Sequence, residues 1–119
     1  MTYVVGRHPK VEQQIERFRK TGAQAQMKTL LERIRDVLAT NPCDEHYRLR
    51  DELRCVQRLK LGRFRLFFIY STPLQRVSVL YIGFRKEGDT ADAYEEFGRL
   101  LKRGYFDNMF AELGLSRDA

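Results

Sequence analysis

The sequence has 119 residues, 43% of them hydrophobic, which favours a single folded domain over residues 1–119 and does not indicate a disordered chain. Lys and Arg number 22 against 16 Asp and Glu, giving a formal net charge of +6. This excess favours polyanionic partners such as nucleic acids.

The N-terminal segment predicts a strand followed by a helix. Residues 2–6 form a short β-branched and aromatic run, which is typical of a strand. Pro9 suits the first turn of a helix. Val11, Ile15 and Phe18 then follow at the i, i+4 and i+7 positions of one helix face. This helix therefore has one apolar stripe that can pack on a sheet.

A second amphipathic helix is predicted over residues 24–39. Asn41-Pro42 ends it, because the residue before a proline avoids the helical region. The short link at residues 21–23 contains glycine, so the two helices are expected to form an antiparallel hairpin. Residues 43–54 are polar with mixed charge, and we interpret them as an irregular connection.

The C-terminal half predicts three strands in an antiparallel meander and then a closing helix. Asp92 and Glu95 have the spacing of a capping box at the start of that helix. The predicted class is therefore α+β: an N-terminal strand, a two-helix hairpin, a three-stranded antiparallel meander and a C-terminal helix. The strands cover residues 55–61, 64–71 and 76–85, the helix covers 92–103, and a short amphipathic turn follows through Phe106, Met109, Phe110 and Leu113.

Gly62-Arg63 matches a two-residue hairpin loop, with glycine at the first central position of a type II′ turn. Such a turn places Lys60 opposite Arg65, and a directly opposed pair of like charges destabilises a sheet. Side chains alternate across a strand, so apolar residues collect on one face and bases on the other. The apolar face holds Leu59, Leu61, Phe64, Leu66 and Phe68, and the other holds Arg58, Lys60 and Arg65 over an exposed apolar floor of Val56, Phe67 and Ile69.

These bases support two interpretations. One solvated face is normal for an antiparallel sheet, and charges on it can simply keep a protein soluble. However, no acid alternates with the bases over residues 56–65, so the repulsion is not relieved within the hairpin. Neighbouring apolar side chains also partly desolvate each cation. We therefore favour an anion-binding site.

Two cysteines, Cys43 and Cys55, occur in a sequence with no signal peptide and no long apolar run. We therefore expect no disulfide, a cytoplasmic location and no membrane association. Cys43 and His46 have a spacing that metal sites use, but only Cys55 and His8 remain as further soft ligands. We expect no metal and no cofactor. His8, directly before Pro9, is expected to be a helix cap or a packing residue.

The stretch "RLKLGRFRLFFIY" resembles the central hairpin of the RelE/ParE superfamily of toxins from type II toxin-antitoxin systems, and within it the YhaV branch. In that branch R-x-K and G-R-[YF]-R-L-F-F are followed by a strand, by D-A-Y and by L-K-R-G. The resemblance is best over residues 55–105 and implies a RelE/ParE-like fold. The matching segments here are Arg58 to Lys60, Gly62 to Phe68, Asp92 to Tyr94, Leu101 to Gly104, and His8-Pro9.

The resemblance implies a metal-independent endoribonuclease, an mRNA interferase that inhibits translation, mostly at the ribosome. The ribose 2′-hydroxyl attacks the adjacent phosphate, which requires a base, an acid and cations that stabilise the developing charge. Carried over by position, the superfamily's working residues are Arg58, Lys60, Arg65, Arg85 and Tyr94. We expect Arg65 and Arg85 to clamp the phosphate. We expect Lys60 to transfer a proton, Arg58 to position the RNA backbone, and Tyr94 to stack on a base or contact the nucleophile.

Four further bases are expected to contact RNA: Arg63, Lys86, Lys102 and Arg103. Lys102 and Arg103 could instead serve as favourable charges at a helix C-terminus, and Tyr94 could simply pack. The sequence also departs from the YhaV branch, because the turn after Lys60 is shorter and Tyr105 follows Lys-Arg-Gly where that branch has histidine. If that histidine is catalytic in relatives, its role here is either lost or carried by tyrosine.

The resemblance also implies a tight complex with a cognate antitoxin that pairs a swapped-hairpin DNA-binding domain with a toxin-binding extension. Messenger RNA and the ribosome are the other implied partners. The alternative is a non-catalytic module: ParE-type relatives inhibit DNA gyrase, and a degenerate toxin would only bind nucleic acid or antitoxin. Because ParE-type relatives generally lack the full basic set, the presence of that set here favours RNA cleavage.

Overall fold

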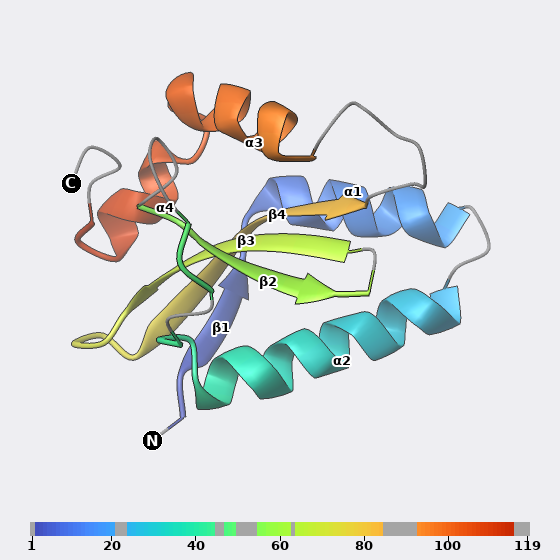
Figure 1. The fold of residues 1–119 in the computed structure, drawn as a ribbon, viewed down its shortest axis with the longest axis horizontal. Coiled ribbons are helices and arrows are strands. Elements are labelled where there is room, and N and C mark those ends of the chain that lie inside the picture. Colours follow the sequence, from blue (N-terminus) through green and yellow to red (C-terminus); the bar gives the residue numbers. More distant parts are fainter. Residues whose placement is uncertain are drawn as a thin grey trace.

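The computed structural model describes residues 2–20, 24–44, 47–49, 55–62, 64–84 and 93–115. In this part of the chain a four-stranded mixed sheet, ordered β1-β4-β3-β2, carries helices on both faces (Figure 1). The α+β prediction is confirmed. The strands are β1 (Val4–Arg7), β2 (Gln57–Leu61), β3 (Phe64–Ser71) and β4 (Arg76–Phe84), and the helices are α1 (Pro9–Lys20), α2 (Gln24–Thr40), α3 (Ala93–Lys102) and α4 (Asp107–Glu112).

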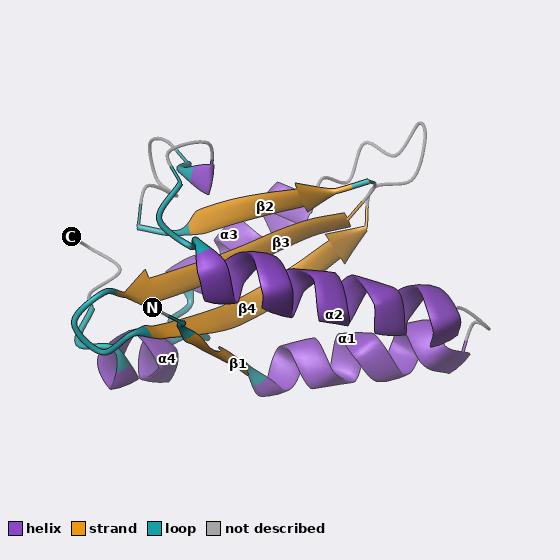
Figure 2. Cartoon of the chain, turned by 90° about the horizontal axis from the view of Figure 1, so that it is seen from below, coloured by secondary structure: helices purple, strands orange, loops and turns teal. Residues whose placement is uncertain are grey.

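Helices α1 and α2 cover one face of the sheet, and α3 and α4 cover the other (Figures 1 and 2). Each face has its own hydrophobic core, and the two cores meet at β3. Phe67 and Phe68 are neighbours on opposite faces of β3, and both are 0% exposed. A strand buried on both faces reads as a continuous apolar run rather than as an alternation. None of the helices in the described ranges is long and apolar enough to span a bilayer.

The N-terminal strand extends the predicted meander into a mixed sheet. Strand β1 pairs in parallel with the first half of β4, from Val4 opposite Arg76 to Arg7 opposite Val79. Beyond β1, the backbone N–H of Ile82 donates to the Gln14 side chain of α1 at 2.8 Å. A helix side chain therefore replaces the missing strand and satisfies the buried backbone of β4.

A β-bulge keeps both faces of β4 apolar. Phe67 is paired with Tyr81 and Phe68 with Val79, so Leu80 is the extra residue on β4. Leu80 and Tyr81 both belong to the core under α3 and α4, whereas Val79 belongs to the other core. The bulge re-aims Tyr81 and places it beside Phe67.

The β2–β3 hairpin has the predicted register, with Lys60 opposite Arg65 and Leu61 opposite Phe64. Gly62 has a φ of +59°, which is the positive value that the first central residue of this turn requires. Arg63, the second turn residue, lies outside the described residues. The glycine thus determines which hairpin side chains face each other.

Gly62→Ala is expected to lower the free energy of unfolding by about 1–2 kcal/mol, because an L side chain in the left-handed region strains the backbone. Gly6→Ala is the matched control: its added Cβ would meet only the Val77 carbonyl oxygen at 3.9 Å, an ordinary contact. Urea unfolding of both variants measures the difference. Equal losses for the two variants would contradict the role assigned to the turn.

Candidate functional site

Three bases of the β2–β3 hairpin share one face of the sheet: Arg58, Lys60 and Arg65. Leu59 and Leu66 lie in the core on the opposite face, so the predicted alternation is confirmed. Lys60 is exposed, whereas Arg58 and Arg65 are half-buried. The like-charged pair predicted at the tip of the hairpin is therefore present, with one member partly removed from water.

The prediction of an exposed apolar floor beneath these bases is wrong. Val56, Phe67 and Ile69 are at most 1% exposed, because α3 and α4 pack over them. Both helices are amphipathic and need an apolar surface, and the second face of the hairpin supplies it. Arg58 consequently meets the first turn of α3.

Arg58 and Tyr94, two of the predicted site residues, are in direct contact. The Arg58 Nη1 atom donates to the Tyr94 hydroxyl at 2.5 Å, and the guanidinium carbon lies 5.7 Å from the ring centroid. The Tyr94 ring packs edge-to-face on Phe67 at 5.4 Å between centroids. Packing and contact with Arg58 therefore coexist at Tyr94, with the hydroxyl held at the basic face.

Arg65 is held against the turn that precedes it. Its Nη1 atom donates to the carbonyl oxygens of Gly62 at 2.8 Å and of Phe64 at 3.0 Å. In the sheet its neighbours are Lys60 on β2 and Gly83 on β4. Because Gly83 has no side chain, nothing on β4 at that register position competes with the guanidinium for space.

Each of the two half-buried arginines has one donor that no residue in the described ranges satisfies. The Nε atoms of Arg58 and Arg65 are buried and have no hydrogen-bond partner among the described residues. Buried donors are normally satisfied by protein, water or an ion. Guanidinium groups match the paired oxygens of phosphates and carboxylates. This part of the hairpin is therefore suited to bind an anion.

The other predicted RNA-contacting residues are not all placed beside this group. Arg63, Arg85 and Lys86 lie outside the described residues, as do Asp92 of the predicted capping box and His46. Lys102 and Arg103 are exposed at the C-terminal end of α3. Eight helical positions separate Lys102 from Tyr94, about 12 Å along the axis. The structure thus groups Arg58, Lys60, Arg65 and Tyr94 and sets Lys102 and Arg103 apart from them.

A family model described as "Toxin with endonuclease activity, of toxin-antitoxin system" matches residues 6–117. The chain belongs to the YhaV family of toxins. The resemblance noted in the hairpin is thereby confirmed over nearly the whole length of the toxin. No curated protein matches the sequence.

Solved structures show that the toxin has the RelE fold. A chain of the RelBE2 toxin-antitoxin complex from Mycobacterium tuberculosis matches with a TM-score of 0.63 at 18% identity, over 71% of this chain and 93% of that one. An arginine double mutant of the E. coli toxin RelE in the free state gives a TM-score of 0.57 at 21% identity, over 87% and 98%. The same mutant with a peptide of its antitoxin RelB gives 0.52 at 24% identity, over the same shares.

A row of side chains across the sheet attaches α3 to the toxin's hairpin. Arg58 is paired with Phe67, and Phe67 with Tyr81, so these residues lie side by side on β2, β3 and β4. Phe97 of α3 stacks on Phe67, with centroids 4.3 Å apart and planes 5° from parallel. Tyr94 of α3 thus contacts Arg58 at one end of the row, and Phe97 contacts Phe67 in the middle.

Tyr81, at the far end of this row, forms a hydrogen bond that the sequence did not predict. The Tyr81 side chain bonds to Glu96 of α3, and burial, together with this bond, raises the pKa of Tyr81 far above its ordinary value. The phenol therefore stays protonated and donates to the carboxylate. Nothing in the local sequence indicates this contact, because Tyr81 reaches α3 only through the bulge at Leu80.

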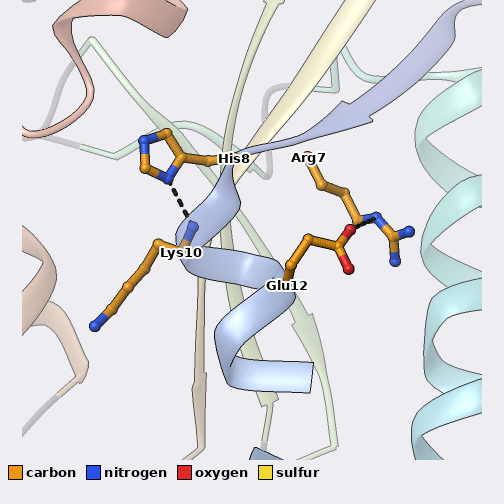
Figure 3. Close-up of polar contacts among 4 residues, drawn as sticks. All are labelled: Arg7, His8, Lys10 and Glu12. Atoms are coloured by element: carbon orange, nitrogen blue, oxygen red, sulfur yellow. Dashed lines mark hydrogen bonds and ion pairs between the residues drawn. The ribbon is translucent and has the colours of Figure 1, made fainter. Parts of the chain in front are cut away.

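His8 joins the start of α1 to the α3–α4 connection and is a cap, as predicted. Its Nδ1 atom accepts the backbone N–H of Lys10 at 2.9 Å (Figure 3). Its ring lies 5.2 Å from Tyr105 and 5.0 Å from Phe106 between centroids. Burial lowers the pKa of His8, and a hydrogen bond to the Tyr105 backbone opposes the shift. Tyr105 therefore packs against the histidine that caps the helix.

The other side of the same helix start carries an ion pair. The Arg7 Nε atom lies 3.0 Å from a Glu12 carboxylate oxygen, and Figure 3 shows this pair pointing away from the imidazole of His8. Both side chains are largely exposed, so the pair contributes little to stability. The position of α1 depends mainly on the cap and on the core beneath the helix.

Tyr81→Phe is expected to lower the free energy of unfolding by about 1–2 kcal/mol, because it removes a hydrogen bond to a charged group and keeps the ring. Tyr70→Phe is the matched control on the opposite face of the sheet, where the hydroxyl bonds to the Cys43 thiol. Thiols are weak hydrogen-bonding groups, so the loss there is expected to be smaller. Urea unfolding at neutral pH compares the two variants, and a Tyr81→Phe loss no greater than that of the control would contradict the anchoring role.

Proposed function

We propose that this toxin is a metal-independent endoribonuclease that cleaves messenger RNA at the ribosome, in the cytoplasm, and so inhibits translation. The observation that carries the proposal is a pair of half-buried arginines, Arg58 and Arg65, whose Nε donors have no hydrogen-bond partner among the described residues. Arg58 also contacts Tyr94. A phosphodiester offers the anionic oxygens that such donors recognise. The endonuclease activity of the family favours cleavage over the non-catalytic alternative.

The proposed reaction uses the substrate's own ribose. The 2′-oxygen attacks the adjacent phosphorus, the bond from phosphorus to the 5′-oxygen breaks, and a 2′,3′-cyclic phosphate and a 5′-hydroxyl result. One proton leaves the 2′-hydroxyl and one reaches the departing 5′-oxygen. Cations fixed where charge develops on the phosphate supply a large part of such catalysis.

Arg58, Lys60, Arg65, Arg85 and Tyr94 are the proposed catalytic residues. Arg65 and Arg85 stabilise the charge on the phosphate. Lys60 transfers a proton, because arginine does not deprotonate in proteins. Arg58 positions the RNA backbone and holds the Tyr94 hydroxyl. That hydroxyl accepts from Arg58 and is proposed to contact the substrate.

Four bases around this group are proposed as secondary RNA contacts: Arg63, Lys86, Lys102 and Arg103. A cognate antitoxin is the proposed protein partner, of the type with a swapped-hairpin DNA-binding domain. The proposal is supported by the family description and by the RelBE2 and RelE–RelB complexes of similar fold. An antitoxin that covers the basic face would silence the enzyme in its own cell.

Arg65→Ala is expected to reduce RNA cleavage about a hundredfold or more, the usual cost of losing one transition-state donor. Two hydrogen bonds to the turn are lost as well, but the repulsion with Lys60 is relieved, so the fold is expected to persist. Arg76→Ala removes the same charge at an exposed position of β4 and is the matched control. Rates are measured on a defined RNA together with melting curves, and an Arg65→Ala variant as active as the control would mean that the site is elsewhere.

Cleavage products are expected to end in a 2′,3′-cyclic phosphate and a 5′-hydroxyl, with a rate unchanged by EDTA. Mapping of RNA ends after incubation with purified toxin, with and without ribosomes, measures the chemistry and the ribosome dependence together. A metal-dependent nuclease on the same RNA confirms that the chelator works. A 5′-phosphate on the products, or loss of activity with EDTA, would mean a different mechanism.

A further inference from the structure

A groove of about 550 Å³ lies between residues 25–33 of α2 and the tip of the β2–β3 hairpin, two segments that run close together in Figure 1. Its volume is within the range of roughly 300–1,000 Å³ that is usual for small-ligand sites. Lys60 lines the groove and also faces Arg65 across the hairpin. Lys60 therefore belongs both to the groove and to the proposed catalytic group.

The walls of the groove carry positive charge and apolar surface. Arg33 of α2 and Lys60 of β2 are both exposed, and no acid is among the described residues that line it. Leu61 and Phe64 are half-buried along the hairpin wall. The Phe64 ring packs edge-to-face on Phe18 at 5.7 Å between centroids, which holds its orientation. Gln26 completes the α2 wall with a side-chain amide.

Cations beside an aromatic and apolar wall match one class of ligand. Single-stranded nucleic acid is bound by positive grooves that follow the backbone and by aromatic rings that contact the bases. A peptide with acidic side chains alone would use the cations but not the aromatic wall, and a purely apolar segment would leave both cations unused. The volume accommodates a nucleotide, and the polar amide of Gln26 can bond to a base edge.

We infer that this groove binds a nucleotide of single-stranded RNA next to the scissile phosphate, with the neighbouring phosphate on Arg33. The inference rests on the proposed ribonuclease function and adds the direction in which the substrate leaves the catalytic group. The RNA passes from Arg58 and Tyr94 over Lys60, around the edge strand β2, and onto residues 25–33 of α2. Arg33 contacts the substrate away from the reacting atoms, so it contributes to affinity and not to the chemical step.

The test measures binding of a fluorescent single-stranded RNA in which every 2′-hydroxyl is methylated, so that no cleavage occurs. Arg33→Ala is expected to weaken the affinity about tenfold and to lower the slope of log affinity against log salt by about 0.7, the value for one phosphate contact on a single strand. Arg35→Ala is the matched control, since Arg35 is exposed on the same helix but lines a different cavity. Its expected change is less than twofold.

On unmodified RNA, Arg33→Ala is expected to raise KM about tenfold and to leave kcat unchanged. Equal losses of affinity in the two variants, or no loss in Arg33→Ala, would overturn the groove as an RNA site. The proposed function is judged separately by Arg65→Ala: if that variant loses cleavage while Arg33→Ala behaves like the control, only the groove fails. Wild-type toxin that neither binds nor cleaves RNA would overturn both.

Discussion

Lys60 and Arg65 face each other across a two-residue turn, and the organisation of the candidate site depends on this pairing. Gly62 supplies the positive φ that determines the turn, and the turn determines the register. Once the register is set, Arg58 must lie on the same face two residues before Lys60. The sheet keeps a pair of like charges that costs stability, and the burial of Arg65 beside Lys60 adds to that cost. An anionic substrate would relieve both effects.

The site also requires that α3 is packed at a fixed position on the face of the hairpin that carries Arg58. Phe67 is buried between Arg58 and Tyr81 in the row across the sheet, and α3 rests on that row through the stacked ring of Phe97. A core on each face of β3 leaves the hairpin little freedom to shift, because packed interiors tolerate few rearrangements. The Tyr94 hydroxyl is thus brought to Arg58 by core packing, and the polar site depends on the apolar layer beneath it.

Local sequence patterns determined most of the elements and the shared face of the three hairpin bases. Pro9 and Asn41-Pro42 indicate where helices begin and end, and the observed bounds follow them closely. Period-two alternation around Gly62 was enough to place Arg58 and Arg65 on one face, because a strand leaves only two directions for a side chain. Resemblance to a toxin family supplied Tyr94 as a further candidate site residue, which alternation alone could not do.

Tertiary packing decided what the local pattern left open. The sequence contains no local signal for the parallel placement of β1 on β4, for the bulge at Leu80, or for the bond between Tyr81 and Glu96. Each of these three features joins segments that are far apart in the chain. Whether such segments come into contact depends on which apolar surfaces the fold must bury together. The same reason explains the error over the hairpin's second face: alternation shows that Phe67 points away from the first core, but only the packing of α3 and α4 determines that this direction is also buried.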